Sequence, residues 1–178
     1  MKTSTTIFTA FVFLILCISC DEVEDLASFT ANTTFNKTIS VAVAEDPENP
    51  VQTVSETATI SLEEDQELQD NLNLIETVRI TSLTYEIRNA LGNDMAHIQV
   101  ASITFGNITL SIDDLNIVAT DQANTIFSVT EAAQLTAIGN ALKNNSNLTV
   151  TLNATIENNP INFDVAVTLT TAIEIQPI

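Results

Sequence analysis

The side chain best suited to acid–base chemistry is His97, the only histidine among the 178 residues. A histidine acts as a general base when a nucleophile, such as Cys or a Gly-flanked Ser, lies beside it. The strand pattern described below places His97 opposite Asn116 and on the face opposite Ile98. No nucleophile of that kind accompanies it, so we interpret His97 as a solvated strand residue and predict no catalytic residue.

Asp113, Asp114 and Asn116 could supply oxygen ligands to calcium, which binds several carboxylate and carbonyl oxygens. Their spacing differs from the Asp-x-Asp-x-Asp-Gly pattern of calcium loops. The alternative, which we favour, is that the two acids mark a kink in a strand. With no Cys/His cluster to hold zinc or iron, the sequence predicts no metal and no cofactor. The chain has 23 Asp and Glu residues, and two of them could always be chosen as a glycosidase-like pair of carboxylates. Their number is therefore no evidence for a glycosidase.

Five threonines fall on the expected solvated face of the last two strands, where they would form a flat ladder of hydroxyl groups. Ice-binding and carbohydrate-binding surfaces can look like this, although the latter usually need exposed aromatic side chains. Threonine is also a good strand former on a solvated face, which is the interpretation we favour. The threonines are Thr149, Thr151, Thr155, Thr168 and Thr170.

Six asparagines occur in Asn-x-Ser/Thr motifs. In a eukaryotic secreted protein they would be glycan acceptors. In a bacterial protein they follow from an Asn- and Thr-rich composition, the interpretation we prefer. They are Asn32, Asn36, Asn107, Asn144, Asn147 and Asn153.

The N-terminus has the pattern of a targeting segment. Lys2 is followed by an apolar run over 7–16 that is too short to span a bilayer, and then by Ser19 and Cys20. This segment resembles the signal peptide of bacterial lipoproteins, in which a small residue precedes a cysteine that is lipidated and becomes the new N-terminus. The resemblance implies lipid attachment at Cys20. It covers residues 1–20 alone, and it departs from the common motif at Cys17 and Ile18.

The alternative is an ordinary secretory signal that is cleaved nearby, with Cys20 incidental. Under the lipoprotein interpretation, residues 21–28 form an acidic tether of a few tens of ångströms at most, at roughly 3.4 Å per residue. An acidic run just after the lipidated cysteine also resembles the surface-export signals of some Gram-negative lipoproteins. Residues 29–178 then form one domain, in which no cysteine remains to form a disulfide.

Residues 78–119 predict a three-strand antiparallel meander in which each strand changes its buried face once, at nearly the same level. We expect a bulge or coil at that level, with the core on opposite faces at the two ends. The predicted pairs of the first two strands are Val78–Phe105, Ile80–Ile103, Leu83–Val100 and Tyr85–Ile98; the Gly106-Asn107 turn gives Phe105–Ile108, Ile103–Leu110, Ala101–Ile112, Ile98–Leu115 and Ala96–Ile117.

The other elements follow from periodicity and turn signals. Alternation predicts strands over 29–43, 54–62 and 126–129, and capping boxes at Ser61/Glu64 and Ser128/Glu131 predict helices over roughly 62–75 and 130–143. Apolar residues on even positions of 148–156 and odd positions of 161–175 predict a hairpin. Its expected pairs are Ile156–Ile161, Ala154–Phe163, Leu152–Val165, Val150–Val167 and Leu148–Leu169.

These elements predict a mainly β domain, an antiparallel sandwich-like arrangement of two layers with eight or nine strands and two short amphipathic helices. The alternative is an α+β arrangement with the helices packed on one antiparallel sheet. The chain carries a net charge of −18, which becomes −19 when Lys2 leaves with the leader. A surface of that sign repels nucleic acid and anionic lipid headgroups, so neither is an expected partner.

Together these patterns predict a lipid-anchored lipoprotein of the bacterial cell envelope, held at the outer membrane, with exposure at the cell surface left open. It would act as a non-enzymatic binding or scaffolding module whose ligand is an envelope protein or a glycan. The alternative is a secreted or surface hydrolase that uses two carboxylates, with or without calcium. That enzyme would need two acids facing each other in a concave site, with raised pKa values.

Overall fold

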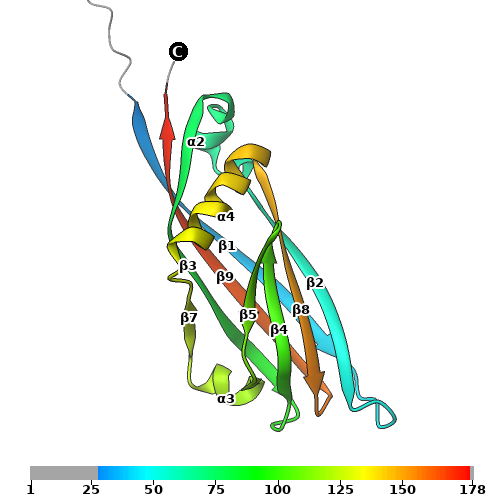
Figure 1. The fold of residues 1–178 in the computed structure, drawn as a ribbon. Helices are drawn as coiled ribbons and strands as arrows, with labels where there is room; N and C mark the ends of the chain where they lie inside the picture. Colours follow the sequence, from blue (N-terminus) through cyan, green and yellow to red (C-terminus); the bar gives the residue numbers. More distant parts are fainter. Residues whose placement is uncertain (1–27, 177–178) are drawn as a thin grey trace, which may run out of the picture.

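The computed structural model describes residues 28–176, which form two antiparallel sheets packed face to face (Figure 1). The predicted mainly β two-layer sandwich is therefore confirmed. The leader, Cys20 and nearly all of the expected tether lie outside the described residues. One sheet has the order β1 (Phe29–Val43), β9 (Ile161–Ile175), β3 (Ile75–Gly92), β7 (Ile126–Ser128), and the other β2 (Val51–Ser61), β8 (Asn147–Glu157), β4 (His97–Phe105), β5 (Ile108–Ile112), with β6 (Leu115–Asn116) also paired to β4.

The chain passes from one sheet to the other at most of its turns. β4 and β5 stay in one sheet, because a tight turn joins them as a hairpin. In that turn Gly106 has a φ of 62°, a conformation that glycine adopts without strain. Here the predicted register is confirmed, with Phe105 opposite Ile108 and Ile103 opposite Leu110. Ile98 likewise pairs with Leu115.

The predicted pairing between the first two strands of the meander is wrong. Tyr85 pairs with Val167 of β9 and with Phe127 of β7, whereas Ile98 lies in the other sheet and pairs with Ile156 of β8. The four residues of the 93–96 turn carry the chain across the core, so β3 and β4 face each other instead of sharing hydrogen bonds.

The predicted hairpin of the last two strands is wrong for the same reason. β8 pairs with β2 and β4, and β9 pairs with β1 and β3. The predicted alternation itself is correct, because even positions of β8 and odd positions of β9 are buried. Those two apolar faces meet from opposite sheets across the core. Alternation cannot distinguish this arrangement from a hairpin.

The change of buried face within the strands is produced by bulges, as predicted. The register of β3 on β9 shifts between Ile80 and Ser82, and that of β4 on β8 shifts between Ile98 and Val100. The expectation that the two ends bury opposite faces is wrong. Each bulge resets the alternation so that the apolar residues on both sides of it join one core, and Val100 is left 67% exposed.

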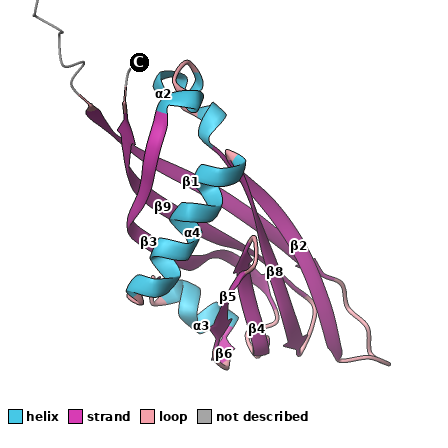
Figure 2. Ribbon diagram, turned by 45° about the horizontal axis from the view of Figure 1, so that its top comes forward, coloured by secondary structure: helices cyan, strands magenta, loops and turns pink. Residues whose placement is uncertain are grey.

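Helix α4 (Ala132–Asn145) packs on β3 and lies across the gap between the two sheets (Figure 2). Its predicted capping box is wrong, because the helix begins at Ala132 and Glu131 makes no side-chain cap. The predicted helix over 62–75 is broken into η1 (Leu62–Glu64), α2 (Gln66–Gln69) and η2 (Leu72–Leu74). The third meander strand ends early, and α3 (Ile117–Gln122) follows it.

Candidate functional site

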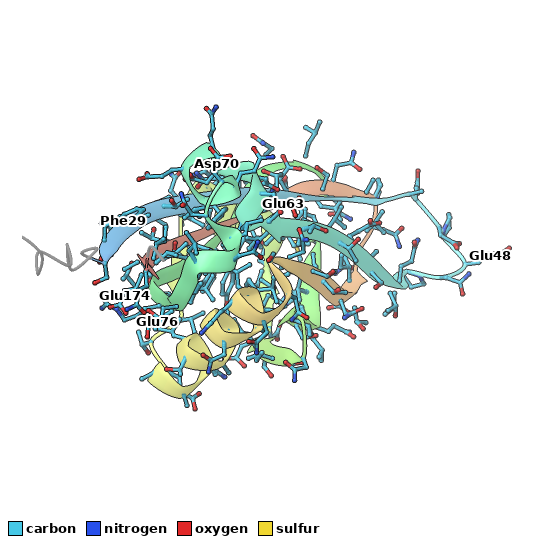
Figure 3. The ribbon with its side chains drawn as sticks, turned by 90° about the horizontal axis from the view of Figure 1, so that it is seen from above. Phe29, Glu48, Glu63, Asp70, Glu76 and Glu174 are labelled. Atoms are coloured by element: carbon cyan, nitrogen blue, oxygen red, sulfur yellow. The ribbon has the colours of Figure 1, made fainter. Side chains whose placement is uncertain are left out.

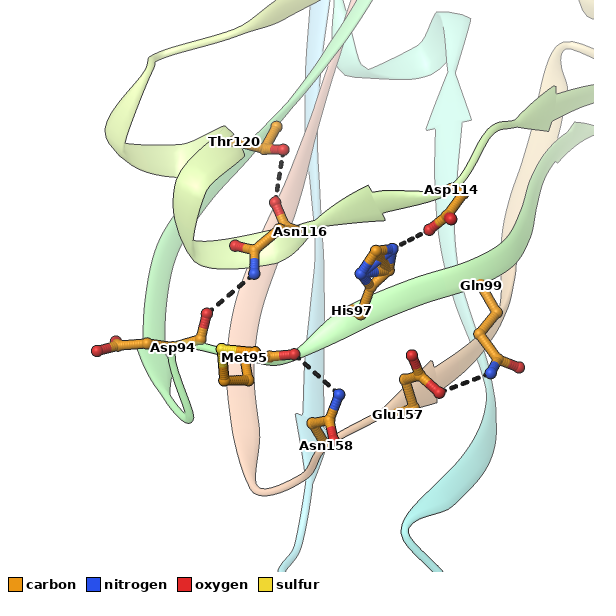
Figure 4. Close-up of polar contacts among 9 residues, drawn as sticks. All are labelled: Asp94, Met95, His97, Gln99, Asp114, Asn116, Thr120, Glu157 and Asn158. Atoms are coloured by element: carbon orange, nitrogen blue, oxygen red, sulfur yellow. Dashed lines mark hydrogen bonds and ion pairs between the residues drawn. The ribbon is translucent and has the colours of Figure 1, made fainter.

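His97, Asp114 and the polar side chains around them lie at the end of the sandwich where the turns after β3 and β8 meet (Figure 4). His97 begins β4, and its Nε2 lies against Oδ1 of Asp114, which lies in the break between β5 and β6. His97 is 30% exposed and Asp114 69%, so the pair is solvated. The predicted placement of His97 opposite Asn116 is confirmed.

Side-chain amides join this end together. Gln99 donates to Oε2 of Glu157 at 2.7 Å, and Asn158 donates to the carbonyl oxygen of Met95 at 3.0 Å. Asn116 donates to the carbonyl of Asp94 at 2.9 Å. Sequence reasoning did not identify these turn residues as part of a site, although it did predict the 157–160 loop. The missing information was that two turns distant in sequence lie at one end.

Beside the pair, the outer face of the second sheet is hollowed into an open groove of about 400 Å³. The groove forms where β5 ends, because the edge of β4 is left uncovered there. Its wall combines hydroxyl, amide and carboxylate side chains with apolar ones, among them the exposed Val100. The groove includes Thr53, Val100, Ser102, Ser111, Asp113, Asp114, Asn153 and Thr155.

Asp113 and Asp114 lie at the break between β5 and β6, as expected of residues that mark a strand kink. They do not form a calcium cage with other acids, because within residues 28–176 no three His, Cys, Asp or Glu side chains come together. Burial and the negative charge of Asp113 together raise the pKa of Tyr85, which stacks on Phe127 with ring centroids 5.0 Å apart.

Hydrogen bonds stabilise the ionised form of two carboxyl groups, those of Asp65 and Asp164. The Thr33 hydroxyl donates to Asp65 at 2.7 Å and lowers the pKa of that carboxyl. Asn89 and Ser40 together lower the pKa of Asp164 by donating to it at 2.8 and 2.7 Å. A general acid needs the opposite shift, so these two carboxyls are structural.

The predicted threonine ladder is divided between the two sheets. Thr168 and Thr170 lie on the outer face of the first sheet, whereas Thr149, Thr151 and Thr155 lie on the outer face of the second. Within the second sheet the hydroxyl pattern is broader than expected. One row crosses four strands as Thr57, Thr151, Thr104 and Thr109, and the next as Ser55, Asn153, Ser102 and Ser111.

Comparisons with known proteins give no family for this chain. No protein-family model and no curated protein matches it. Among solved structures, it is similar to the decameric BFDV capsid protein, with 11% identity and a TM-score of 0.38 over 83% of this chain and 99% of that one. None of the helices in residues 28–176 is long and apolar enough to cross a membrane.

Proposed function

We propose that the protein is a lipoprotein of the bacterial cell envelope, anchored in the outer membrane through Cys20, and that its β domain is a non-enzymatic binding module. The observation that carries the proposal is the leader pattern, with Ser19 and Cys20 directly after the apolar run and only residues 21–28 between Cys20 and strand β1. A tether of that length keeps the start of β1 within about 30 Å of the anchor.

The direction of β1 then decides which end of the domain reaches away from the membrane. β1 has 15 residues and spans about 50 Å, at roughly 3.4 Å per residue. Both ends of the described chain lie at the same end of the sandwich, beside α2, whereas the turn after β1 lies at the other (Figure 1). The end that holds His97 and Asp114 would therefore be presented to partners outside the membrane.

The charge at the anchored end supports attachment by lipid. Figure 3 looks down on this end and shows Glu174 and Glu76 beside Phe29, with Asp70 and Glu63 farther from it. Anionic lipid headgroups repel such a surface, so electrostatic attraction to the bilayer would not hold the protein. Two acyl chains would hold it, because each buried methylene adds about 0.8 kcal/mol of membrane affinity.

Metabolic labelling with a clickable palmitate analogue tests this proposal. The wild-type chain is expected to be labelled and to sediment with membranes. Cys20→Ser should be unlabelled, and should be either soluble or retained with its leader uncleaved. Cys17→Ser is the matched control and should behave as wild type, because that residue leaves with the leader. A wild-type chain that is soluble and unlabelled would overturn the lipoprotein proposal.

A further inference from the structure

We propose that a second groove, lined by asparagine side chains, binds a neutral oligosaccharide. This groove has a volume of about 770 Å³ and lies between the C-terminal half of α4, the β4–β5 turn and the start of β8. The inference rests on the binding-module role proposed above and names its ligand class. The groove is distinct from the smaller one beside Asp114, and none of its residues takes part in the His97 pair.

Four asparagines supply the hydrogen-bonding groups of this asparagine-lined groove. Asn140 and Asn144 are four residues apart on one face of α4, Asn107 is in the β4–β5 turn, and Asn147 begins β8. Within residues 28–176 no protein group bonds to these four side-chain amides. Asn145 is different, because it donates to the carbonyl of Ala141 at 2.8 Å.

A primary amide offers two donors and one acceptor with two lone pairs. Adjacent hydroxyl groups of a sugar ring offer the same combination of donors and acceptors. Four such amides, arriving from three elements around one groove, can therefore bond several hydroxyls of a single ligand. Three of the four, Asn107, Asn144 and Asn147, belong to the Asn-x-Ser/Thr motifs that the sequence singled out.

The groove is uncharged in a chain whose net charge is −18. Lys143 belongs to the same helix turn, but its Nζ donates to the carbonyl of Glu76 on β3. An anionic ligand would find no cation in the groove, and it would approach against the negative field of the whole protein. A cationic ligand would find no carboxylate. The groove is therefore matched to a neutral ligand.

The walls also provide apolar surface and rigidity. The partly exposed Ile108 lines the groove together with two small alanines of α4, and these side chains can pack against the C–H face of a sugar ring. Ile138 and Leu142 are fully buried beneath the helix and fix its position on the sheet. A site with preformed walls loses little entropy when it binds, which makes weak individual hydrogen bonds effective.

The test uses the full chain in a zwitterionic detergent, because a detergent with a sugar headgroup would compete. Neutral glucan, xylan and mannan oligosaccharides are screened by immobilised array, with oligogalacturonate as the acidic comparison, and the tightest neutral probe is titrated by calorimetry. The double variant Asn140→Ala/Asn144→Ala should raise Kd at least tenfold. Its melting temperature should not fall, because alanine favours the helix more than asparagine does.

Asn73→Ala, which removes an exposed asparagine outside the groove, is the matched control and should leave Kd unchanged. Failure of every neutral probe to bind, equal binding of oligogalacturonate, or an unchanged Kd in the folded double variant would each overturn the inference. Palmitate labelling of the same preparation distinguishes the two proposals. Labelled protein without sugar binding removes the ligand class alone, whereas unlabelled protein that binds sugar removes the anchor alone.

Discussion

The two long sides of the sandwich are closed in different ways. On one side the outermost strands are β1 and β2, which have 15 and 11 residues and carry a charged residue at an inward-facing position, Lys37 and Glu56 respectively. On the other side the outermost strands are β7 and β5, which have three and five residues, and α4 lies across the gap (Figure 2). Inward-pointing charges and covering helices are both known ways to keep an edge strand from pairing with another chain.

The difference has a functional consequence. A helix laid across a gap leaves hollows along its margins. The asparagine-lined groove lies at such a margin, between α4 and β8. A second, smaller hollow lies between α4 and β3, beside Val78 and Ile80. We therefore expect changes under α4 to affect both stability and ligand binding, and changes at the β1–β2 side to affect self-association.

The largest effect is expected from Leu142→Ala, which empties the space beneath α4. Leu142 is fully buried, and removal of a buried leucine side chain costs about 3 kcal/mol through lost transfer free energy and the cavity that remains. Leu91→Ala is the matched control, because Leu91 is 74% exposed and its loss should change the free energy of unfolding by less than about 0.5 kcal/mol. Urea denaturation measures both. Equal values for the two variants would show that α4 is not packed as a cover.

Gly139→Ala tests how closely helix α4 packs against strand β3. A Cβ at Gly139 would lie 2.3 Å from the carbonyl oxygen of Val78, so the helix must move away from β3. Overpacking of this kind costs about 2 kcal/mol, although alanine by itself favours a helix. The neighbouring Asn140→Ala should be neutral or slightly stabilising. A Gly139→Ala variant more stable than wild type would contradict this close approach of α4 to β3.

The strands, their buried residues and the sandwich could be predicted from sequence because they depend on local alternation. The β4–β5 register was also predictable, since a two-residue Gly106-Asn107 turn leaves one way to pair. The placement of β3 and β4, and of β8 and β9, in opposite sheets was not predictable. Four-residue turns such as 93–96 can join neighbours in one sheet or carry the chain to the other, and Tyr85 and Ile98 have the same apolar pattern in both cases.

The candidate site was predictable only in part. The pairing that brings His97 opposite Asn116 follows from the β4–β5 register, and the strand break at Asp113 and Asp114 follows from the change of buried face. The asparagine-lined groove depends on where α4 crosses the second sheet, which no local pattern fixes. A signal was present in the sequence as the Asn-x-Ser/Thr motifs at Asn107, Asn144 and Asn147, but composition explained it equally well.

Asp65 ties the 62–74 segment to the β1–β2 side, and its effect should depend on pH. Its carboxylate accepts from the Thr33 hydroxyl and caps α2, so its pKa lies below the ordinary value. A lowered folded-state pKa contributes stability above the unfolded pKa of about 3.9, and that contribution is lost as pH falls through the folded pKa. Asp65→Asn should therefore cost about 1 kcal/mol at neutral pH and nearly nothing well below the folded-state pKa of Asp65.

Denaturation curves at several pH values measure this difference, and NMR titration of the Asp65 carboxyl reports its pKa directly. Thr33→Val is the matched variant. It removes the hydroxyl that donates to Asp65 and should return the pKa toward its ordinary value. A destabilisation by Asp65→Asn that is the same at all pH values would assign the whole effect to the shape of the cap and none to the charge.

The smallest effect on the free energy of unfolding, and the most direct test of the comparison, is expected from Lys37→Val with Glu56→Val. Lys37 pairs with Glu64 at 2.6 Å at a solvated position, and such ion pairs contribute about 0–1 kcal/mol. Valine also suits a strand, so the monomer should remain folded. What changes is the side itself, where two long strands lose the charges that oppose pairing with a second copy.

We expect the double variant to form dimers or larger assemblies at concentrations where the wild type is monomeric, as measured by analytical ultracentrifugation. Lys37→Arg with Glu56→Asp is the matched control, because it keeps both charges and should sediment as wild type. The same valine substitutions should leave the asparagine-lined groove unaffected, since it lies on the helix-covered side. A monomeric double variant would mean that the twist and shape of β1 and β2, rather than their charges, protect this side.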